Sequence, residues 1–271
     1  MHRRRGATAA PLEGRRRCRL SPCRANVSRV NFFGHAWVAG CFAGSEAFIL
    51  GSMLPDLANM LRTAPPAARH AEVSAGVRLH HETDRVFHDT EAFRALETEA
   101  RLDLSNAGVP KGSRRALAHV GVELLIDAEL AATTPAWRGY SVALQFGSSE
   151  RCGERLEWQS LDTRPRFRAL CDRLAAVASV RAEKTRIAER LVAALAGRPR
   201  LELAAEHVGC LEPWLATCRP QVAARLPELL AELARGLDAP LSPALPGAPG
   251  FSPPPPADAG WLAPARRRLA R

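Results

Sequence analysis

Apolar residues recur every three or four positions along most of the chain between residues 30 and 240, which is the spacing of one buried helix face. No segment alternates apolar and polar residues over the length of a strand. The pattern predicts an all-α fold with helices over Ala43–Leu61, Ala71–Arg101, Ser113–Leu130, Phe167–Val177, Ala182–Leu195, Glu202–Thr217 and Pro220–Leu237. Glycines and prolines predict a loop-rich segment over Ala131–Asp162 and a helix break at Pro220.

Both ends of the chain lack this periodicity. Residues 1–29 hold nine arginines against one acidic residue, and residues 241–271 include the run Pro253–Pro256. Such segments cannot bury enough apolar surface to offset the entropy lost on ordering. We therefore expect one helical domain over residues 30–240, flanked by disordered tails.

The net charge of +10 at first favours a nucleic-acid partner. However, the positive charge is concentrated in the first 29 and the last 23 residues, so residues 30–248 are close to neutral. The distribution of charge therefore predicts no nucleic-acid partner for the domain.

The seven cysteines are widely spaced and form no C-x-x-C motif, which argues against a disulfide framework and a zinc knuckle. No apolar run reaches the roughly 20 residues needed to cross a bilayer, and the arginine-rich start does not resemble a secretory signal. We expect free thiols, no membrane span and a cytoplasmic location.

Histidines and acidic residues gather in the first half of the predicted domain. Imidazole nitrogens and carboxylate oxygens are the usual ligands of divalent metals, so this composition indicates a metal site. The residues concerned are His35, His70, His80, His81, His88 and His119, with Asp56, Asp84, Asp89, Glu123 and Asp127.

Two predicted helices concentrate these side chains. At about 100° per residue, four candidate ligands share one face of the helix over 71–101, namely His80, His81, Asp84 and His88. A solvated polar face is the alternative, but three histidines among the four favour a site.

The helix over 113–130 carries His119, Glu123 and Asp127 at four-residue spacing among apolar residues. Buried carboxylates need a charged partner or a metal, so an ion pair with Arg114 or Arg78 is the alternative interpretation.

The order of these residues resembles the acyl carrier protein phosphodiesterase family, which is related to the HD-domain metal phosphohydrolases. Family members carry Met-Asn-Phe-Leu-x-His, then Gly-Asn-x-Leu-x-Asp, then Gly-Ile-x-x-His-Arg-x-Ile-Asp-x-x-Thr-Asp. The corresponding segments here are 30–35, 51–56 and 76–88, followed by a weaker match at 197–201. The match carries over at His35, Asp56, His80 and Asp84, whereas this chain departs from the family at His81, Phe87, His88 and Ala128.

The resemblance also concerns the start of the chain. The family pattern begins with Met where this sequence has Val30. Our hypothesis is that residues 1–29 are an upstream extension produced by a misassigned start site.

The resemblance implies an HD-like helical hydrolase of lipid metabolism that releases 4'-phosphopantetheine from holo acyl carrier protein. The implied cofactor is a divalent metal, with Mn²⁺ first and Mg²⁺, Fe²⁺ or Zn²⁺ as alternatives. We expect its ligands to be His35, Asp56, His80, Asp84 and Asp127. Candidates for proton transfer or ligand orientation are His81, His88, Asp89 and His119, and candidates for binding phosphate are Arg78 and Arg85.

Two other functions stay open at this point. The first is an HD-like phosphohydrolase that acts on a nucleotide, a lipid or another small phosphodiester. The second is a non-catalytic helical interaction module whose buried polar residues are structural.

Overall fold

The computed structural model describes residues 32–42, 45–133, 137–178, 187–196 and 201–241. Its described part is a single helical body, which confirms the all-α prediction. Within these residues a single small sheet pairs β1 (Ala67–Ala68) with β2 (Leu156–Glu157) in antiparallel fashion. Apart from Leu241, both predicted tails lie outside the described residues. Among the described helices, none is long and apolar enough to cross a membrane.

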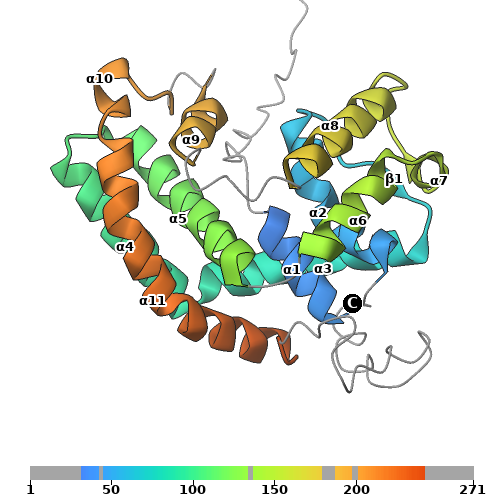
Figure 1. The fold of residues 1–271 in the computed structure, drawn as a ribbon, viewed down its shortest axis with the longest axis horizontal. Helices are drawn as coiled ribbons and strands as arrows, with labels where there is room; N and C mark the ends of the chain where they lie inside the picture. The colour runs from blue at the N-terminus through green and yellow to red at the C-terminus, as the bar shows by residue number, and fades with distance from the viewer. Residues whose placement is uncertain (1–31, 43–44, 134–136, 179–186, 197–200, 242–271) are drawn as a thin grey trace, which may run out of the picture.

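Two groups of helices make up the body (Figure 1). The first group consists of α2 (Glu46–Met60), α6 (Trp137–Ser148), α7 (Glu150–Gly153) and α8 (Thr163–Ala178). The second group consists of α4 (Glu91–Asn106), α5 (Lys111–Thr133), α9 (Ile187–Leu195), α10 (Ala205–Val208) and α11 (Leu211–Leu237). Each group is held by helix-on-helix packing, with α2 against α6 and α8 in the first and α11 against α4 and α5 in the second.

Helices α1 (Phe32–Phe42) and α3 (Ala71–Asp89) join the two groups, as Figure 1 shows. Helix α3 packs on α2 and also on α4 and α11, while α1 packs on α2, α5 and α6. The crossing of α2 and α3 is close because glycines face each other there: a Cβ atom on Gly76 would overlap the carbonyl oxygen of Phe48. Side chains on α1 and α3 therefore lie at the junction of the two groups.

The predicted helix over 71–101 is in fact two helices that meet at Thr90. The backbone of Thr90 is extended, with φ −64° and ψ 143°. Its hydroxyl donates to the carbonyl of Phe87 at 2.7 Å and accepts from the amide of Phe93 at 3.3 Å. Thr90 thus ends α3 and caps α4, so residues on either side of it no longer share one helical face.

Two other boundary predictions were wrong. The segment predicted to be loop-rich contains α6, whose Tyr140, Ala143 and Leu144 are buried with helical spacing. Helix α11 continues through Pro220 and Pro227, and it begins at Leu211. Both prolines lie on the exposed face, while the opposite face buries apolar side chains against the second group.

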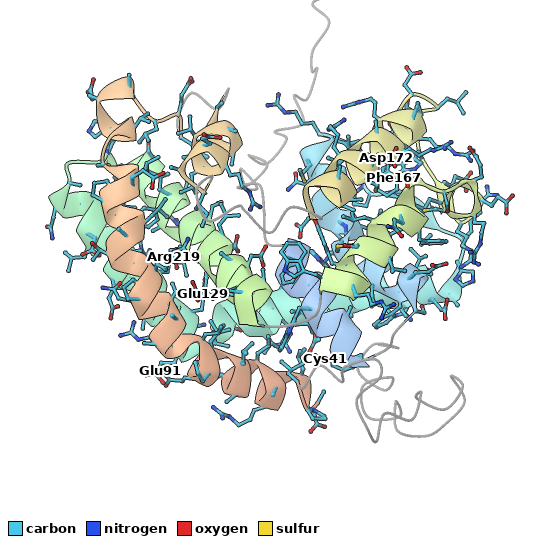
Figure 2. All side chains as sticks on the ribbon, viewed as in Figure 1. Cys41, Glu91, Glu129, Phe167, Asp172 and Arg219 are labelled. Atoms are coloured by element: carbon cyan, nitrogen blue, oxygen red, sulfur yellow. The ribbon has the colours of Figure 1, made fainter. Side chains whose placement is uncertain are left out.

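Side chains of the described residues are drawn in Figure 2. Arg219 of α11 lies 3.8 Å (Nη1 to Oε1) from Glu129 of α5, which links these two helices at their partly buried edge. The cysteines in the described part, namely Cys41, Cys152, Cys171, Cys210 and Cys218, are free thiols, as the sequence predicted for them.

Candidate metal centre

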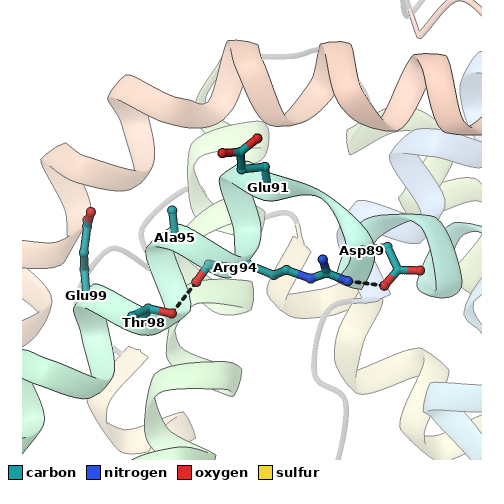
Figure 3. A pocket seen from close by; sticks show the side chains of 6 residues that line it. All are labelled: Asp89, Glu91, Arg94, Ala95, Thr98 and Glu99. Carbon is teal, nitrogen blue, oxygen red and sulfur yellow. Dashed lines mark hydrogen bonds and ion pairs between the residues drawn. The ribbon is translucent and has the colours of Figure 1, made fainter.

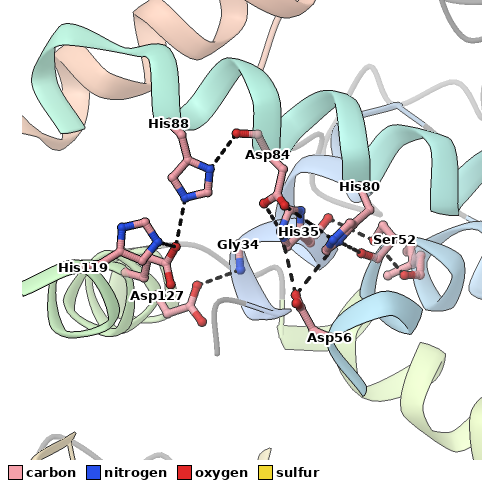
Figure 4. Close-up of polar contacts among 11 residues, drawn as sticks. Gly34, His35, Ser52, Asp56, His80, Asp84, His88, His119 and Asp127 are labelled. Carbon is pink, nitrogen blue, oxygen red and sulfur yellow. Dashed lines mark hydrogen bonds and ion pairs between the residues drawn. The ribbon is translucent and has the colours of Figure 1, made fainter. Parts of the chain in front are cut away.

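Four predicted ligands converge at the junction of α1, α2 and α3 (Figure 4). We call His35, Asp56, His80 and Asp84 the inner cluster. His35 Nε2 lies 3.3 Å from Asp84 Oδ1 and 3.8 Å from Asp56 Oδ2. His80 Nε2 lies 3.7 Å from Asp84 Oδ2, and the two imidazole ring centroids are 4.1 Å apart. The four residues are only 1–7% exposed.

Local hydrogen bonds fix the orientation of the inner histidines. His80 Nδ1 lies 2.9 Å from the carbonyl oxygen of Ser52. Because a carbonyl can only accept, Nδ1 carries the proton, and the lone pair of neutral His80 is on Nε2, which faces Asp84. Ser52 is itself held, since its hydroxyl contacts the carbonyl oxygens of His35 and Ile49. The ring of His80 is thus oriented as in protein metal sites, where the second nitrogen donates to a carbonyl.

The donor set fits a divalent metal ion. Two carboxylates lie in this buried site beside two imidazoles, and burying carboxylates is costly unless a cation compensates their charge. Ligand atoms of His35, Asp56 and His80 all lie within 4.8 Å of one another. These buried groups can therefore hold a metal ion, through nitrogen and oxygen ligands of the kind that Zn²⁺, Mn²⁺ and Fe²⁺ accept.

Beside the inner cluster lies a small cavity. It is about 20 Å³ in volume and extends from His35 and Asp84 to Leu229, Leu230 and Leu233 of α11. A volume of this size holds about one water molecule. The cavity has room for a water beside the cluster but not for a substrate group.

Asp127, the fifth predicted ligand, does not join the inner cluster. Its Oδ1 accepts a 2.8 Å hydrogen bond from the amide of Gly34 at the start of α1 (Figure 4). Burial raises the pKa of Asp127 to about 7, although the charge of Arg190 and the backbone amides of Gly34 and Phe33 act in the opposite direction. Asp127 therefore caps α1 and positions His35, which follows Gly34 directly.

A second group of ligand-type residues lies between α3 and α5. We call His88, His119 and Glu123 the outer cluster. Glu123 Oε1 lies 3.2 Å from His88 Nε2 and 3.3 Å from His119 Nε2. The two rings stack with centroids 5.0 Å apart and an interplanar angle of 15°. Glu123 thus pairs with histidines, not with Arg78 or Arg114.

Opposite charges on His119 and Glu123 stabilise each other in the outer cluster. Burial lowers the pKa of His119, but hydrogen bonds and charges from Glu123 and Glu97 outweigh it and raise the pKa to about 9. Burial raises the pKa of Glu123, but hydrogen bonds from His119 and His88 lower it to about 2. Without a metal, the outer cluster is therefore an ion pair between protonated His119 and ionised Glu123.

Of the other predicted site residues, His81 touches the inner cluster, since its ring lies edge-on to that of His80 with centroids 5.2 Å apart, while Asp89, Arg78 and Arg85 lie at the surface. Asp89 is exposed, pairs with Arg94 and lines a surface hollow on α4 (Figure 3). His81 is exposed too, so the predicted four-residue face of α3 includes only three inward-facing members. Arg78 lies on the exposed side of α3, and Arg85 pairs with Glu82 at 2.6 Å.

Sequence reasoning missed two residues that orient the candidate ligands. Glu97 of α4 lies 3.7 Å (Oε1) from His119 Nδ1, and the carbonyl of Ser52 orients His80. No motif marks either one. The position of Glu97 depends on the turn at Thr90, and a backbone carbonyl leaves no trace in the sequence.

Comparisons of the chain with protein-family models, with curated proteins and with solved structures gave no match.

Proposed function

We propose that this chain is a metal-dependent phosphodiester hydrolase with the inner cluster as its metal centre. The observation that carries the proposal is the convergence of two imidazoles and two carboxylates from three helices in a buried position. A divalent ion held there would supply an activated water and would neutralise charge that develops on phosphoryl oxygens.

Each side chain of the inner cluster has a distinct task in this proposal. His35, Asp56 and His80 would hold the ion, and Asp84, the most exposed of the four, would complete the set on the side of the small cavity. Asp127 would keep α1 in place so that His35 stays oriented. Arg78 and Arg85 lie on the exposed face of the same helix, where they could bind a phosphate that approaches from solvent.

The resemblance described above favours one substrate and one metal for the first test. The substrate to test first is holo acyl carrier protein, from which hydrolysis would release 4'-phosphopantetheine, and the metal to test first is Mn²⁺. A related phosphohydrolase acting on a nucleotide, a lipid or another small phosphodiester would use the same donor set.

The test compares both substrates in the presence of Mn²⁺. Release of phosphopantetheine from holo acyl carrier protein is measured beside turnover of bis-p-nitrophenyl phosphate. We expect Asp56→Asn to reduce either activity by at least about 100-fold, because it removes one metal ligand. The matched control is His70→Gln, since His70 lies at the start of α3 outside both clusters.

Each result has a defined meaning. Turnover of the small ester alone would favour the related phosphohydrolase. No turnover of either substrate by metal-loaded protein, or full activity in Asp56→Asn, would contradict the proposal.

The closed surroundings of the inner cluster favour one other candidate, a non-catalytic helical module with a structural cluster. His35, Asp56 and His80 are 1–3% exposed, and the neighbouring cavity holds about one water. In that case metal removal would lower the melting temperature, but the metal-loaded protein would hydrolyse neither substrate.

A further inference from the structure

We propose that the outer cluster is a second metal site, which binds a divalent transition ion such as Zn²⁺ independently of the inner cluster. This inference goes beyond the proposed hydrolase and does not depend on it. The site would have two histidine nitrogens and one carboxylate as ligands, from His88, His119 and Glu123.

The spacing of the three ligand atoms suits such an ion. Both Nε2 atoms lie 3.2–3.3 Å from the same carboxylate oxygen, and the three ligand atoms are all within 4.8 Å of one another. Bonds of about 2.0–2.2 Å in a tetrahedral arrangement place neighbouring ligand atoms about 3.3 Å apart. An ion could therefore enter the outer cluster with small side-chain movements.

The far side of each ring is occupied as in known metal sites. His88 Nδ1 lies 2.8 Å from the backbone carbonyl of Asp84, which can only accept, so Nδ1 is the donor. His119 Nδ1 faces the carboxylate of Glu97 at 3.7 Å. Imidazoles that bind metals commonly donate their second N–H to a carbonyl or a carboxylate. Both Nε2 atoms are thereby directed to Glu123.

This arrangement calls for a cation beside Glu123. His88 Nε2 and Glu123 Oε1 lie 3.2 Å apart, and such a contact is favourable only when a proton or a metal ion lies between the two atoms. The Glu123 side chain is 2% exposed, and its Oε2 has no hydrogen-bond partner among the described residues. A buried oxygen in this state is costly, and a metal ion would give it a ligand bond.

The outer cluster would also be the more accessible of the two sites. The side chains of His88 and His119 are 24% and 26% exposed, whereas those of His35 and His80 are 2% and 1% exposed. Three protein ligands with solvent access leave a coordination position for water or an anion. The chemistry of the ligands, two imidazoles and one carboxylate, favours Zn²⁺, Co²⁺ or Fe²⁺ over Mg²⁺ or Ca²⁺.

Metal titration of the full chain tests the inference. The protein is stripped with a chelator and titrated with Zn²⁺ by calorimetry and with Co²⁺ by visible absorption. We expect His88→Gln and His119→Gln each to remove one equivalent of bound metal, or to weaken it at least about 100-fold, while Asp56→Asn keeps that equivalent. His70→Gln is the matched control and should bind as the unaltered chain does.

A graded variant separates ligation from general loss of structure. Glu97→Gln should weaken the same equivalent by about 10-fold, because Glu97 only positions His119. Circular dichroism of each variant without metal shows whether it is folded. If His119→Gln is unfolded, His88→Gln decides, because His88 takes no part in the contact between His119 of α5 and Glu97 of α4.

Two results would overturn the inference. One is metal binding by folded His88→Gln that equals binding by the unaltered chain in stoichiometry and affinity. The other is the loss of all binding in folded Asp56→Asn, which would assign every bound ion to the inner cluster. The proposed hydrolase can fail while this inference holds. In that case the inner cluster binds no metal, but the unaltered chain still takes up one equivalent of metal that folded His88→Gln lacks.

Discussion

The inner and outer clusters lie one turn apart on α3, since Asp84 belongs to one and His88 to the other. The inner cluster balances two carboxylates against two imidazoles and is almost fully buried. The outer cluster has one carboxylate for two imidazoles and is partly open to solvent. The same residue types therefore meet different conditions because α3 passes from the α2 crossing to a position beside α4 and α5.

This difference shows what each cluster needs in order to be stable. The outer cluster can compensate its own charge by protonating His119. The inner cluster holds two carboxylates in an almost fully buried position, so it has more negative charge to compensate, and a bound divalent cation would compensate it. Removal of bound metal should therefore destabilise the inner cluster more than the outer cluster.

The largest effect is expected from a substitution at the α2–α3 crossing, which would disrupt the inner cluster. Gly76→Val should lower the free energy of unfolding by about 3 kcal/mol, the upper end of the overpacking range, because the new side chain meets the backbone of Phe48. It should also weaken metal binding at the inner cluster, since the crossing places Asp56 beside His80. Urea unfolding and metal titration measure both effects.

The control for this variant is Gly40→Ala on α1. A Cβ atom at Gly40 meets nothing within 4 Å, so its stability should be unchanged or should rise by up to about 1 kcal/mol. Equal stability of Gly76→Val and the unaltered chain would show that α2 and α3 do not cross as closely as described.

The next effect concerns the pH dependence that Asp127 introduces. Its pKa is about 7 in the fold and near 3.8 when unfolded, so the folded chain binds the extra proton between these values. Its stabilising contribution is complete below pH 3.8 and is lost as the pH rises through about 7. Between about pH 5 and 6 the free energy of unfolding should fall by about 1.4 kcal/mol per pH unit.

Asp127→Asn should abolish this slope, because the amide oxygen still accepts from Gly34 but does not ionise. Denaturant unfolding at several pH values in that range measures it for both chains. If the slope is the same in the variant, Asp127 is already ionised in the folded chain at pH 5, and it does not act as a neutral cap of α1.

A smaller effect of pH is expected at the outer cluster in metal-free protein, and it arises from a histidine instead of a carboxylate. The pKa of His119 is about 9 in the fold against 6.5 when unfolded, so its stabilising contribution is complete below pH 6.5 and is lost as the pH rises through 9. His119 is partly exposed, so we discount this to about 1 kcal/mol. His119→Gln should remove the alkaline loss, as thermal unfolding in the presence of a chelator would show.

The ion pair of Glu123 with His119 makes stability depend on pH at the acidic end of the pH scale. The stability that this ion pair contributes should be complete above pH 4.5 and should disappear as the pH falls through about 2.

One result would contradict the prediction for His119. If the loss of stability at alkaline pH persists in His119→Gln, another group is responsible for it.

The smallest effect is expected at the exposed face of α3. Arg85→Gln breaks a surface ion pair with Glu82, so its stability should change by no more than about 1 kcal/mol. If Arg85 binds substrate phosphate, KM should nevertheless rise while kcat stays close to that of the unaltered chain. An unchanged KM would remove Arg85 from the substrate path.

The sequence predicted the helical class and four of the ligand-type residues that meet. It did so because helical periodicity is a local property, and because imidazole nitrogens and carboxylate oxygens are the usual ligands of divalent metals, so that His35, Asp56, His80 and Asp84 are candidates by residue type. The break at Thr90 was not predictable from periodicity alone, since apolar spacing continues across it. Glu97 could not be placed for the same reason.

Tertiary packing decided the remaining differences. Helix α6 forms in a segment with glycines because Tyr140 and Leu144 are buried between neighbouring helices. Helix α11 tolerates Pro220 and Pro227 because both lie on its exposed face, while Leu226 and Leu229 are held on the other. Asp127 was predicted to be a ligand from its spacing, but spacing along α5 does not reveal that α1 begins beside it.

The hydrogen bond from Gly34 to Asp127 joins residues 93 positions apart in the chain. A contact of such long range costs loop-closure entropy when it forms, and it cannot form before both residues have been synthesised. Helix α1 is thus held at its beginning by a residue that leaves the ribosome long after it. We expect His35 to be the last member of the inner cluster to take its place, so a newly made chain would bind metal there only after α5 has docked.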